Sequence, residues 1–248
     1  MSHQEPNLKR TGSVLLFALL PFIAAGCASS AKAVFAQRDP IALVSVTSNG
    51  DINWQGEEST NPNTASPLSN RALRTDEDLT LVTSADELIN TAEIIIRDKF
   101  SFSQQINLAE KETVLLSRAY RNADQNRYQI YDKDVKPEAY EFIDYRDKNF
   151  PPALAAETGI QRCMFVEFDF TKVIARGMGK NGNFRANVEM KVFVLDAEGK
   201  TLYSKAVSVK SLDTIKVSYR AYSQTGIIEL FESTIDDVCD EFLNKLGK

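Results

Sequence analysis

The chain has 248 residues, of which 43% are hydrophobic and 25% are charged, and its net charge is −5. This is ordinary globular material, long enough for one large domain or two small ones. The acidic balance argues against nucleic acid, which needs a basic stripe, and predicts no electrostatic attraction to anionic lipid. The only histidine is His3, so residues 4–248 exclude histidine-based catalysis and histidine-bound metal.

A short apolar segment near the start of the chain predicts export. Residues 13–26 are apolar or small. Lys9 and Arg10 precede this run, and Cys27 follows it directly. These 14 residues are fewer than the ~20 needed to span a bilayer, and their flanks are typical of a secretory signal peptide. The small residues before Cys27 resemble the lipobox of bacterial lipoproteins, although Ala24 stands where that motif usually has leucine.

The lipobox resemblance implies a layout and a compartment. Residues 1–26 would be the signal peptide, Cys27 would carry the lipid, and residues 27–39 would be a short polar tether. Residues 40–248 would form a single periplasmic domain. Ala28 after the cysteine favours the outer membrane by analogy with lipoprotein sorting. The alternative is an ordinary signal peptide cut a few residues later, with Cys27 unmodified.

Hydrophobic periodicity predicts one α+β domain. Strands are expected at 41–46, 112–121, 164–170, 188–195 and 201–209, and helices at 84–100, 152–159 and 227–246. Residues 47–78 are rich in Asn, Ser, Thr and Pro and are expected to form a long loop. Residues 122–150 are expected to be an irregular crossover with a little helix near 137–145. The fold class is therefore a single mixed β-sheet with helices packed mainly on one face.

This pattern resembles a group of periplasmic lipoproteins. The likeness lies in the lipobox, the IALVSV strand at 41–46, the PALAAETGIQRCMFVEF stretch at 152–168, the hairpin at 194–202 and the closing helix. It is similar to the amino-terminal domain of TolB and the core of the curli channel subunit CsgG, over roughly residues 40–246. The resemblance implies the fold; members include a secretion channel, an activator of cell-wall synthesis and a translocation component.

Two cysteines remain once Cys27 is assigned to lipid. Cys163 and Cys239 are a candidate disulfide, because an oxidising periplasm permits pairing and a bridge would contribute roughly 4 kcal/mol. The alternative is two buried or half-buried free thiols, and the spacing does not decide between them. Two cysteines without histidine predict no metal site.

Four aromatic residues form a candidate partner-binding surface. They are Trp54, Tyr128, Tyr131 and Tyr140. Aromatic anchors dominate many protein interfaces. The same residues would alternatively pack as a satellite core beneath the 122–150 crossover.

Two further motifs carry weaker signals. Residues 177–182 match GxGxxG, but strands on both sides favour a hairpin connection over a nucleotide-binding turn. Arg176 and Lys180 there could contact an anionic partner. Glu167 and Asp169 point to one side of a strand, where paired carboxylates could serve an enzyme but solvent exposure is the simpler interpretation.

The leading hypothesis is a lipid-anchored envelope protein that binds a partner protein or assembles into an envelope complex, without catalysis or a cofactor. One alternative is an oligomeric component similar to the secretion channel. Another is an enzyme that acts on the cell wall through carboxylates. The sequence identifies neither the partner nor the oligomeric state.

Overall fold

The computed structural model describes residues 34–35, 39–54, 85–124, 134–178, 181–218 and 223–247. For Trp54 it describes only the backbone. The expected signal peptide, Cys27, Tyr128, Tyr131, Lys180 and residues 55–78 of the expected loop lie outside these ranges.

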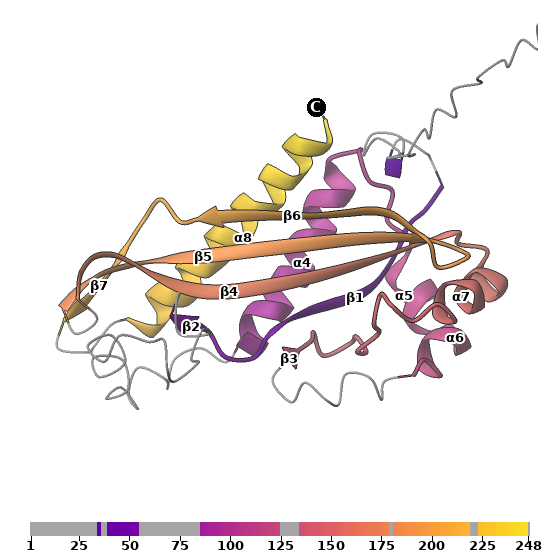
Figure 1. Ribbon diagram of the computed structural model, residues 1–248, viewed down its shortest axis with the longest axis horizontal. Helices are drawn as coiled ribbons and strands as arrows, with labels where there is room; N and C mark the ends of the chain where they lie inside the picture. The colour runs from indigo at the N-terminus through magenta and orange to yellow at the C-terminus, as the bar shows by residue number, and fades with distance from the viewer. Residues whose placement is uncertain are drawn as a thin grey trace, which may run out of the picture.

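The described residues form one seven-stranded mixed sheet with helices on its faces (Figure 1). The strands are β1 (Ala42–Asn49), β2 (Asn53–Trp54), β3 (Asp134–Val135), β4 (Arg162–Met178), β5 (Asn181–Asp196), β6 (Thr201–Lys210) and β7 (Ile215–Ser218). The main order is β3-β1-β4-β5-β6, while β2 pairs with β4 and β7 pairs with β5. β1 and β2 run parallel to β4, and every other pair is antiparallel. The expected α+β fold with a single mixed sheet is confirmed.

Strands β4 and β5 form a hairpin that is much longer than the alternating pattern predicted. Alternation is clean where Phe168 lies opposite Met190, and it weakens beyond Phe170 because Thr171 and Lys172 follow. The ladder nevertheless continues to Met178, since β2 pairs with β4 and β7 pairs with β5 along this outer part. The hairpin beyond Phe170, together with β7, is called the arm below; it lies at the left of Figure 1.

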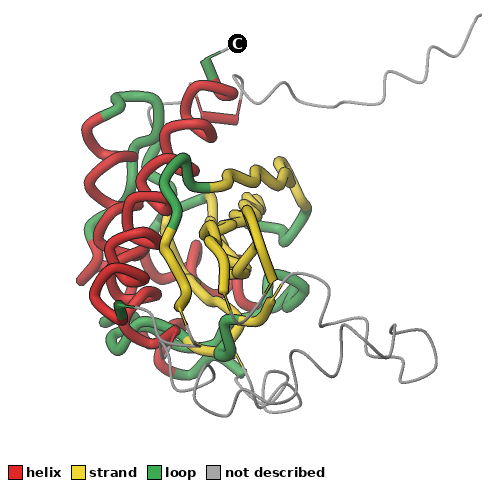
Figure 2. Tube along the Cα trace, turned by 90° about the vertical axis from the view of Figure 1, so that its left-hand side faces the viewer, coloured by secondary structure: helices red, strands yellow, loops and turns green. Residues whose placement is uncertain are grey.

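Two long helices cover one face of the sheet side by side (Figure 2). They are α4 (Ala85–Phe102) and α8 (Gln224–Leu246), close to the predicted bounds. Their apolar faces meet the even-numbered side chains of β4 and β5, and Phe100 stacks on Phe242 with ring centroids 5.5 Å apart. This is the larger of the two cores.

Three short helices cover one end of the opposite face. They are α5 (Lys111–Leu115), α6 (Arg118–Arg121) and α7 (Phe150–Thr158). They bury a second core with residues such as Val44 and Phe165. The α7 prediction is confirmed, and Gly159 ends that helix at φ +77°, a backbone angle that favours glycine.

The expected strand at 112–121 is wrong, because α5 and α6 occupy this segment. Ser117 separates them, and its hydroxyl accepts a hydrogen bond from the Tyr120 amide at 3.1 Å, which caps α6. The Glu157 carboxylate accepts from the Arg118 and Ala119 amides, each at 2.8 Å. Such caps satisfy amides that a strand would have paired with a neighbour, and they are poorly visible in periodicity. The expected helix near 137–145 is also wrong, since this segment forms turns.

Candidate functional site

Tyr140 is the one residue of the predicted aromatic surface whose side chain the structure describes, and it is fully buried. It is therefore not available to a partner on the surface. It belongs to the larger core rather than to the satellite core of the alternative interpretation, and a polar network accepts its hydroxyl group. The backbone of Trp54 pairs with Lys172 of β4.

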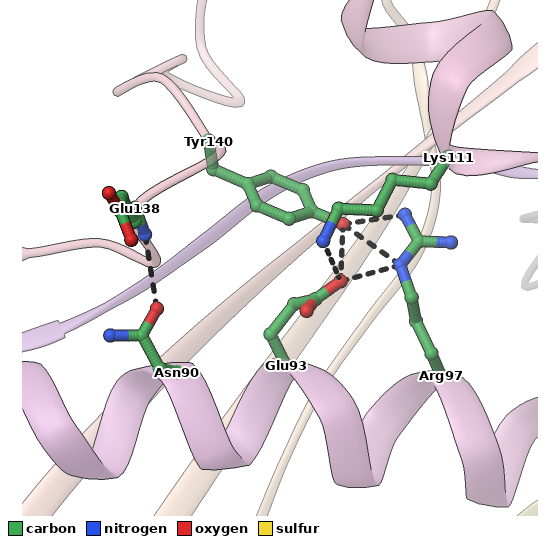
Figure 3. A network of polar contacts seen from close by, with 6 residues as sticks. All are labelled: Asn90, Glu93, Arg97, Lys111, Glu138 and Tyr140. Carbon is green, nitrogen blue, oxygen red and sulfur yellow. Dashed lines mark hydrogen bonds and ion pairs between the residues drawn. The ribbon is translucent and has the colours of Figure 1, made fainter.

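The network around Tyr140 joins three parts of the fold (Figure 3). Glu93 and Arg97 come from α4, Lys111 begins α5, and Tyr140 lies in the turn segment. A single carboxylate oxygen, Glu93 Oε1, lies 2.6 Å from Arg97 Nε and 3.1 Å from Lys111 Nζ, and it accepts the Tyr140 hydroxyl at 3.0 Å. The Tyr140 oxygen accepts in turn from Arg97 Nη2 at 2.5 Å. These contacts fix α4 against α5 and the turn segment.

Burial and neighbouring charges shift the pKa values of Tyr140 and Arg97. Burial raises the pKa of Tyr140, against the opposing effect of the Arg97 cation. Burial lowers the pKa of Arg97, but Tyr140 and Glu93 more than compensate and leave it raised. At neutral pH, Arg97 is therefore a cation and Tyr140 a neutral phenol. These properties suit a structural clamp.

A second buried cation fastens the start of the domain. Arg162 is 3% exposed, and its guanidinium donates hydrogen bonds to the carbonyl oxygens of Val34 and Asp39. Val34 and Phe35 are themselves buried in the larger core, where Phe35 meets Tyr203 edge-to-face at 5.1 Å. The fold thus begins at Val34 at the latest, which corrects the expected tether of 27–39. We call Val34, Phe35 and Asp39 the strap.

Cys163 and Cys239 are free, so the candidate disulfide is not formed. The sheet lies between the two cysteines and keeps their thiols apart. Cys163 belongs to the core beneath α5–α7, whereas Cys239 on α8 belongs to the core of the opposite face. Burial raises the pKa of both thiols to about 12, so both are unreactive at neutral pH.

Glu167 and Asp169 share one sheet face, as their alternation predicted. They lie opposite Lys191 and Glu189 of β5, on the face that α4 and α8 leave uncovered. Both are partly buried. Burial raises the pKa of Glu167, while Lys191 opposes this effect.

The two grooves described here have mixed polar linings. One of about 400 Å³ lies between α4 and α8 beside Lys99, which ion-pairs with Asp236 and Asp240 at 2.8 and 2.7 Å. The other, of about 470 Å³, lies between α6 and α7 beside Arg118 and Glu157. Within the described ranges, no group of three or more carboxylates, thiols or imidazoles could hold a metal ion. No helix among these residues is both long and apolar enough to cross a membrane.

Sequence reasoning did not single out Glu93, Arg97, Lys111 or Arg162. A signal was present for two of them. Glu93 lies four residues after Ile89 and three before Ile96, on the apolar stripe of a predicted helix. Arg162 has the same parity as Met164 and Val166, which places a cation on the apolar side of a strand.

No family model matches the chain, and no curated protein matches it. Among solved structures, it is similar to the hypothetical protein CT253 from Chlamydia trachomatis, with 11% identity and a TM-score of 0.35, over 85% of this chain and 98% of that one. It is also similar to lipoprotein GNA1162 from Neisseria meningitidis, with 13% identity and a TM-score of 0.29, over 83% and 99%. Likenesses at these scores do not establish a shared fold or role.

Proposed function

We propose that the chain is an envelope lipoprotein that is anchored through lipid on Cys27 and acts by binding rather than by catalysis. The domain would face the periplasm from the outer membrane. The charged residues, apolar run and small residues before Cys27 support this proposal. The TolB-like and CsgG-like roles remain predictions.

The observation that carries the proposal is the buried strap. Arg162 holds the backbone of residues 34 and 39, so only residues 28–33 separate the anchor from the fold. Seven peptide steps from Cys27 to Val34 reach at most about 25 Å. An anchored domain would therefore stay close to the bilayer, which suits a protein that works at the membrane surface.

The polar clusters of the domain support a role without catalysis. The Glu93 carboxylate is occupied by Arg97, Lys111 and Tyr140, which leaves this buried group committed to the fold. The Asp144 carboxylate is likewise paired with Arg146 at 2.7 Å. A catalytic acid or base needs access to a substrate proton.

Anchoring is tested by metabolic labelling with palmitate. The full chain should incorporate label and remain with the membrane fraction, and Cys27→Ser should lose both properties. Cys163→Ser and Cys239→Ser are matched controls that should keep the label. Label on Cys27→Ser, or an unlabelled soluble wild type, would contradict the anchor.

The binding role is tested by chemical cross-linking in intact cells followed by mass spectrometry. The anchored chain should give discrete cross-links to another envelope component. Light scattering of the purified full chain in detergent is the companion measurement. A closed ring of subunits would favour the channel-like alternative instead, and an absence of cross-links would remove the binding role.

A further inference from the structure

The arm and the adjoining end of β6 carry a cluster of cations on one face, in a chain that is acidic overall. The cluster consists of Arg176 on β4, Arg185 on β5, Lys210 at the end of β6 and Lys216 on β7, and we call it the basic face. All four residues are exposed. It includes Arg176, which the sequence had marked as a possible contact for an anion.

Strand register places the four cations on the same side of the sheet. Arg176 and Lys216 both lie opposite Asn183 on β5, and Lys210 lies opposite Asn187. Side chains at directly opposed positions share a face, and so do alternate residues along a strand. Asn183, Arg185 and Asn187 alternate on β5, so all four cations project from one face. The intervening Phe184 and Ala186 are buried on the opposite side.

The four cations of the basic face lie close together and have no ion-pair partner among the described residues. From the usual strand spacing and rise, the four Cα positions fall within an area of about 10 by 14 Å. None of the four cations forms an ion pair with a carboxylate of any described residue, in contrast to Lys99 and Lys111. The four cations give this region a local excess of positive charge in a chain of net charge −5, and the exposed Asp213 in the β6–β7 turn is the acidic residue between Lys210 and Lys216.

We propose that the basic face binds the phosphodiester headgroups of an anionic phospholipid bilayer. Protein interfaces are enriched in aromatic residues and depleted in lysine. On this face, the residues beside the cations include Val173, Asn183, the buried Thr171 and Asn187, and Glu189, which follows Asn187 on the same face; none of them is aromatic. Leu212, 87% exposed, lies in the β6–β7 turn between Lys210 and Lys216. Basic side chains next to an exposed aliphatic one are typical of surfaces that bind the membrane interface.

The inference rests on the proposed function, because the lipid anchor on Cys27 is what places the domain at the bilayer. Arg176 lies fourteen residues along β4 from Arg162, or about 45 Å from the point where the strap is held. The tether reaches at most about 25 Å. The strap packs on the α4–α8 side of the sheet and the basic face lies on the other side. The anchor and the basic face therefore reach one bilayer together when the long axis of the sheet lies along the membrane and the tether passes around the edge of the domain. Anchor and basic face would then fix the orientation of the domain.

The test measures contact between the arm and lipid in the anchored full chain. Thr214, exposed in the β6–β7 turn, is replaced by Cys and labelled with an environment-sensitive fluorophore, since Cys163 and Cys239 are buried. The protein is reconstituted into vesicles of phosphatidylcholine alone or with phosphatidylglycerol, each with a quencher-bearing lipid. Quenching should be strong only in the anionic vesicles and should fall in high salt.

The deciding variant reverses the basic face with Arg176→Glu, Arg185→Glu, Lys210→Glu and Lys216→Glu. Its control reverses four exposed cations at the other end of the sheet: Arg118→Glu, Arg121→Glu, Lys148→Glu and Lys200→Glu. Both change net charge equally. The arm contact should weaken about fivefold for each reversed cation of the basic face, and should persist in the control.

Three outcomes would overturn the proposal. They are equal quenching in both vesicle types, an equal loss in both variants, and cross-links from position 214 to an acidic protein with no response to lipid. A failure of the anchor is seen separately. Cys27→Ser would then match wild type in palmitate labelling, while added anionic vesicles would still quench the Thr214→Cys probe if the basic face binds lipid.

Discussion

The clamp around Glu93 and the basic face are two groups of cations in opposite environments: the cations of the clamp are paired with a buried carboxylate, and those of the basic face are exposed. In the clamp, Arg97 and Lys111 converge on one buried carboxylate oxygen. On the basic face, Arg185 and its three neighbours project into solvent without an acidic partner among the described residues. The first arrangement stabilises the domain, whereas the second adds little to stability and leaves its charge available. The contrast separates charges that hold the structure from charges that can serve a partner.

The clamp should be the more costly to break. Glu93→Ala leaves Arg97 and Lys111 facing each other beside the buried Tyr140 without a counter-charge. Removing one partner of a buried ion pair costs about 3–5 kcal/mol. We expect a loss of this size in the free energy of unfolding, measured by urea denaturation.

A matched control for the clamp is Glu229→Ala on α8. Glu229 is exposed on its helix, so its removal should change stability by no more than about 0.5 kcal/mol. Equal losses in both variants would mean that the clamp is no more important than a surface charge.

Arg162 and Arg185 allow a direct comparison of a buried arginine with an exposed one. Arg162→Met removes the hydrogen bonds to the strap and should lower the free energy of unfolding by about 2–3 kcal/mol. Burial lowers the pKa of Arg162 and the Asp39 carboxylate opposes this effect, so the buried guanidinium needs its hydrogen-bond partners to offset its desolvation. Arg185→Met should leave stability within about 0.5 kcal/mol of wild type.

Hydrogen exchange gives a local measure of the same comparison. Peptides that span residues 34–41 should exchange faster in Arg162→Met and at the wild-type rate in Arg185→Met. Unchanged exchange in Arg162→Met would mean that the buried side chain of Phe35 holds the strap without the arginine.

The sequence predicted the sheet, its two long helices and the closing hairpin, because each buries a repeating apolar face. It failed where polar contacts decide the structure. At residues 112–121, the Ser117 cap and the Glu157 carboxylate determine two short helices, and no periodicity encodes a contact 39 residues away. The tether was expected to extend to residue 39, whereas Val34 and Phe35 are buried in the larger core and Arg162 holds the backbone of the strap, a contact that forms only in the folded chain.

The basic face was not predicted for a related reason. Arg176 was noted with Lys180 in one loop, whereas Lys210 and Lys216 join Arg176 only through the pairing of β5 with β6 and β7. The net charge of the chain therefore does not predict this surface, because an acidic chain gains a local cationic cluster once β4, β5, β6 and β7 lie side by side. Which cations become neighbours depends on the register of the paired strands, and the amino-acid composition does not specify that register.

Glu167 is an intermediate case between the clamp and the basic face, and it should have the smallest effect. Burial raises its pKa, Asp144 adds to this and Lys191 opposes it. A carboxyl whose pKa is higher in the folded state binds its proton more tightly there. Its charge therefore destabilises the fold at neutral pH, and this cost disappears as pH falls below the unfolded pKa of about 4.3.

Glu167→Gln keeps the shape and removes the charge, so it should be slightly more stable than wild type at pH 7 and equal to it near pH 3.5. Denaturation midpoints across this range measure the difference, with Glu198→Gln in the exposed turn as the control that shows none. If Glu167→Gln were instead less stable than wild type at pH 7, and the difference disappeared as pH fell, the Glu167 charge would stabilise the fold. Lys191 would then outweigh burial. Glu167 would then belong with the paired charges of the clamp, because its ion pair rather than its desolvation would determine its contribution to the fold.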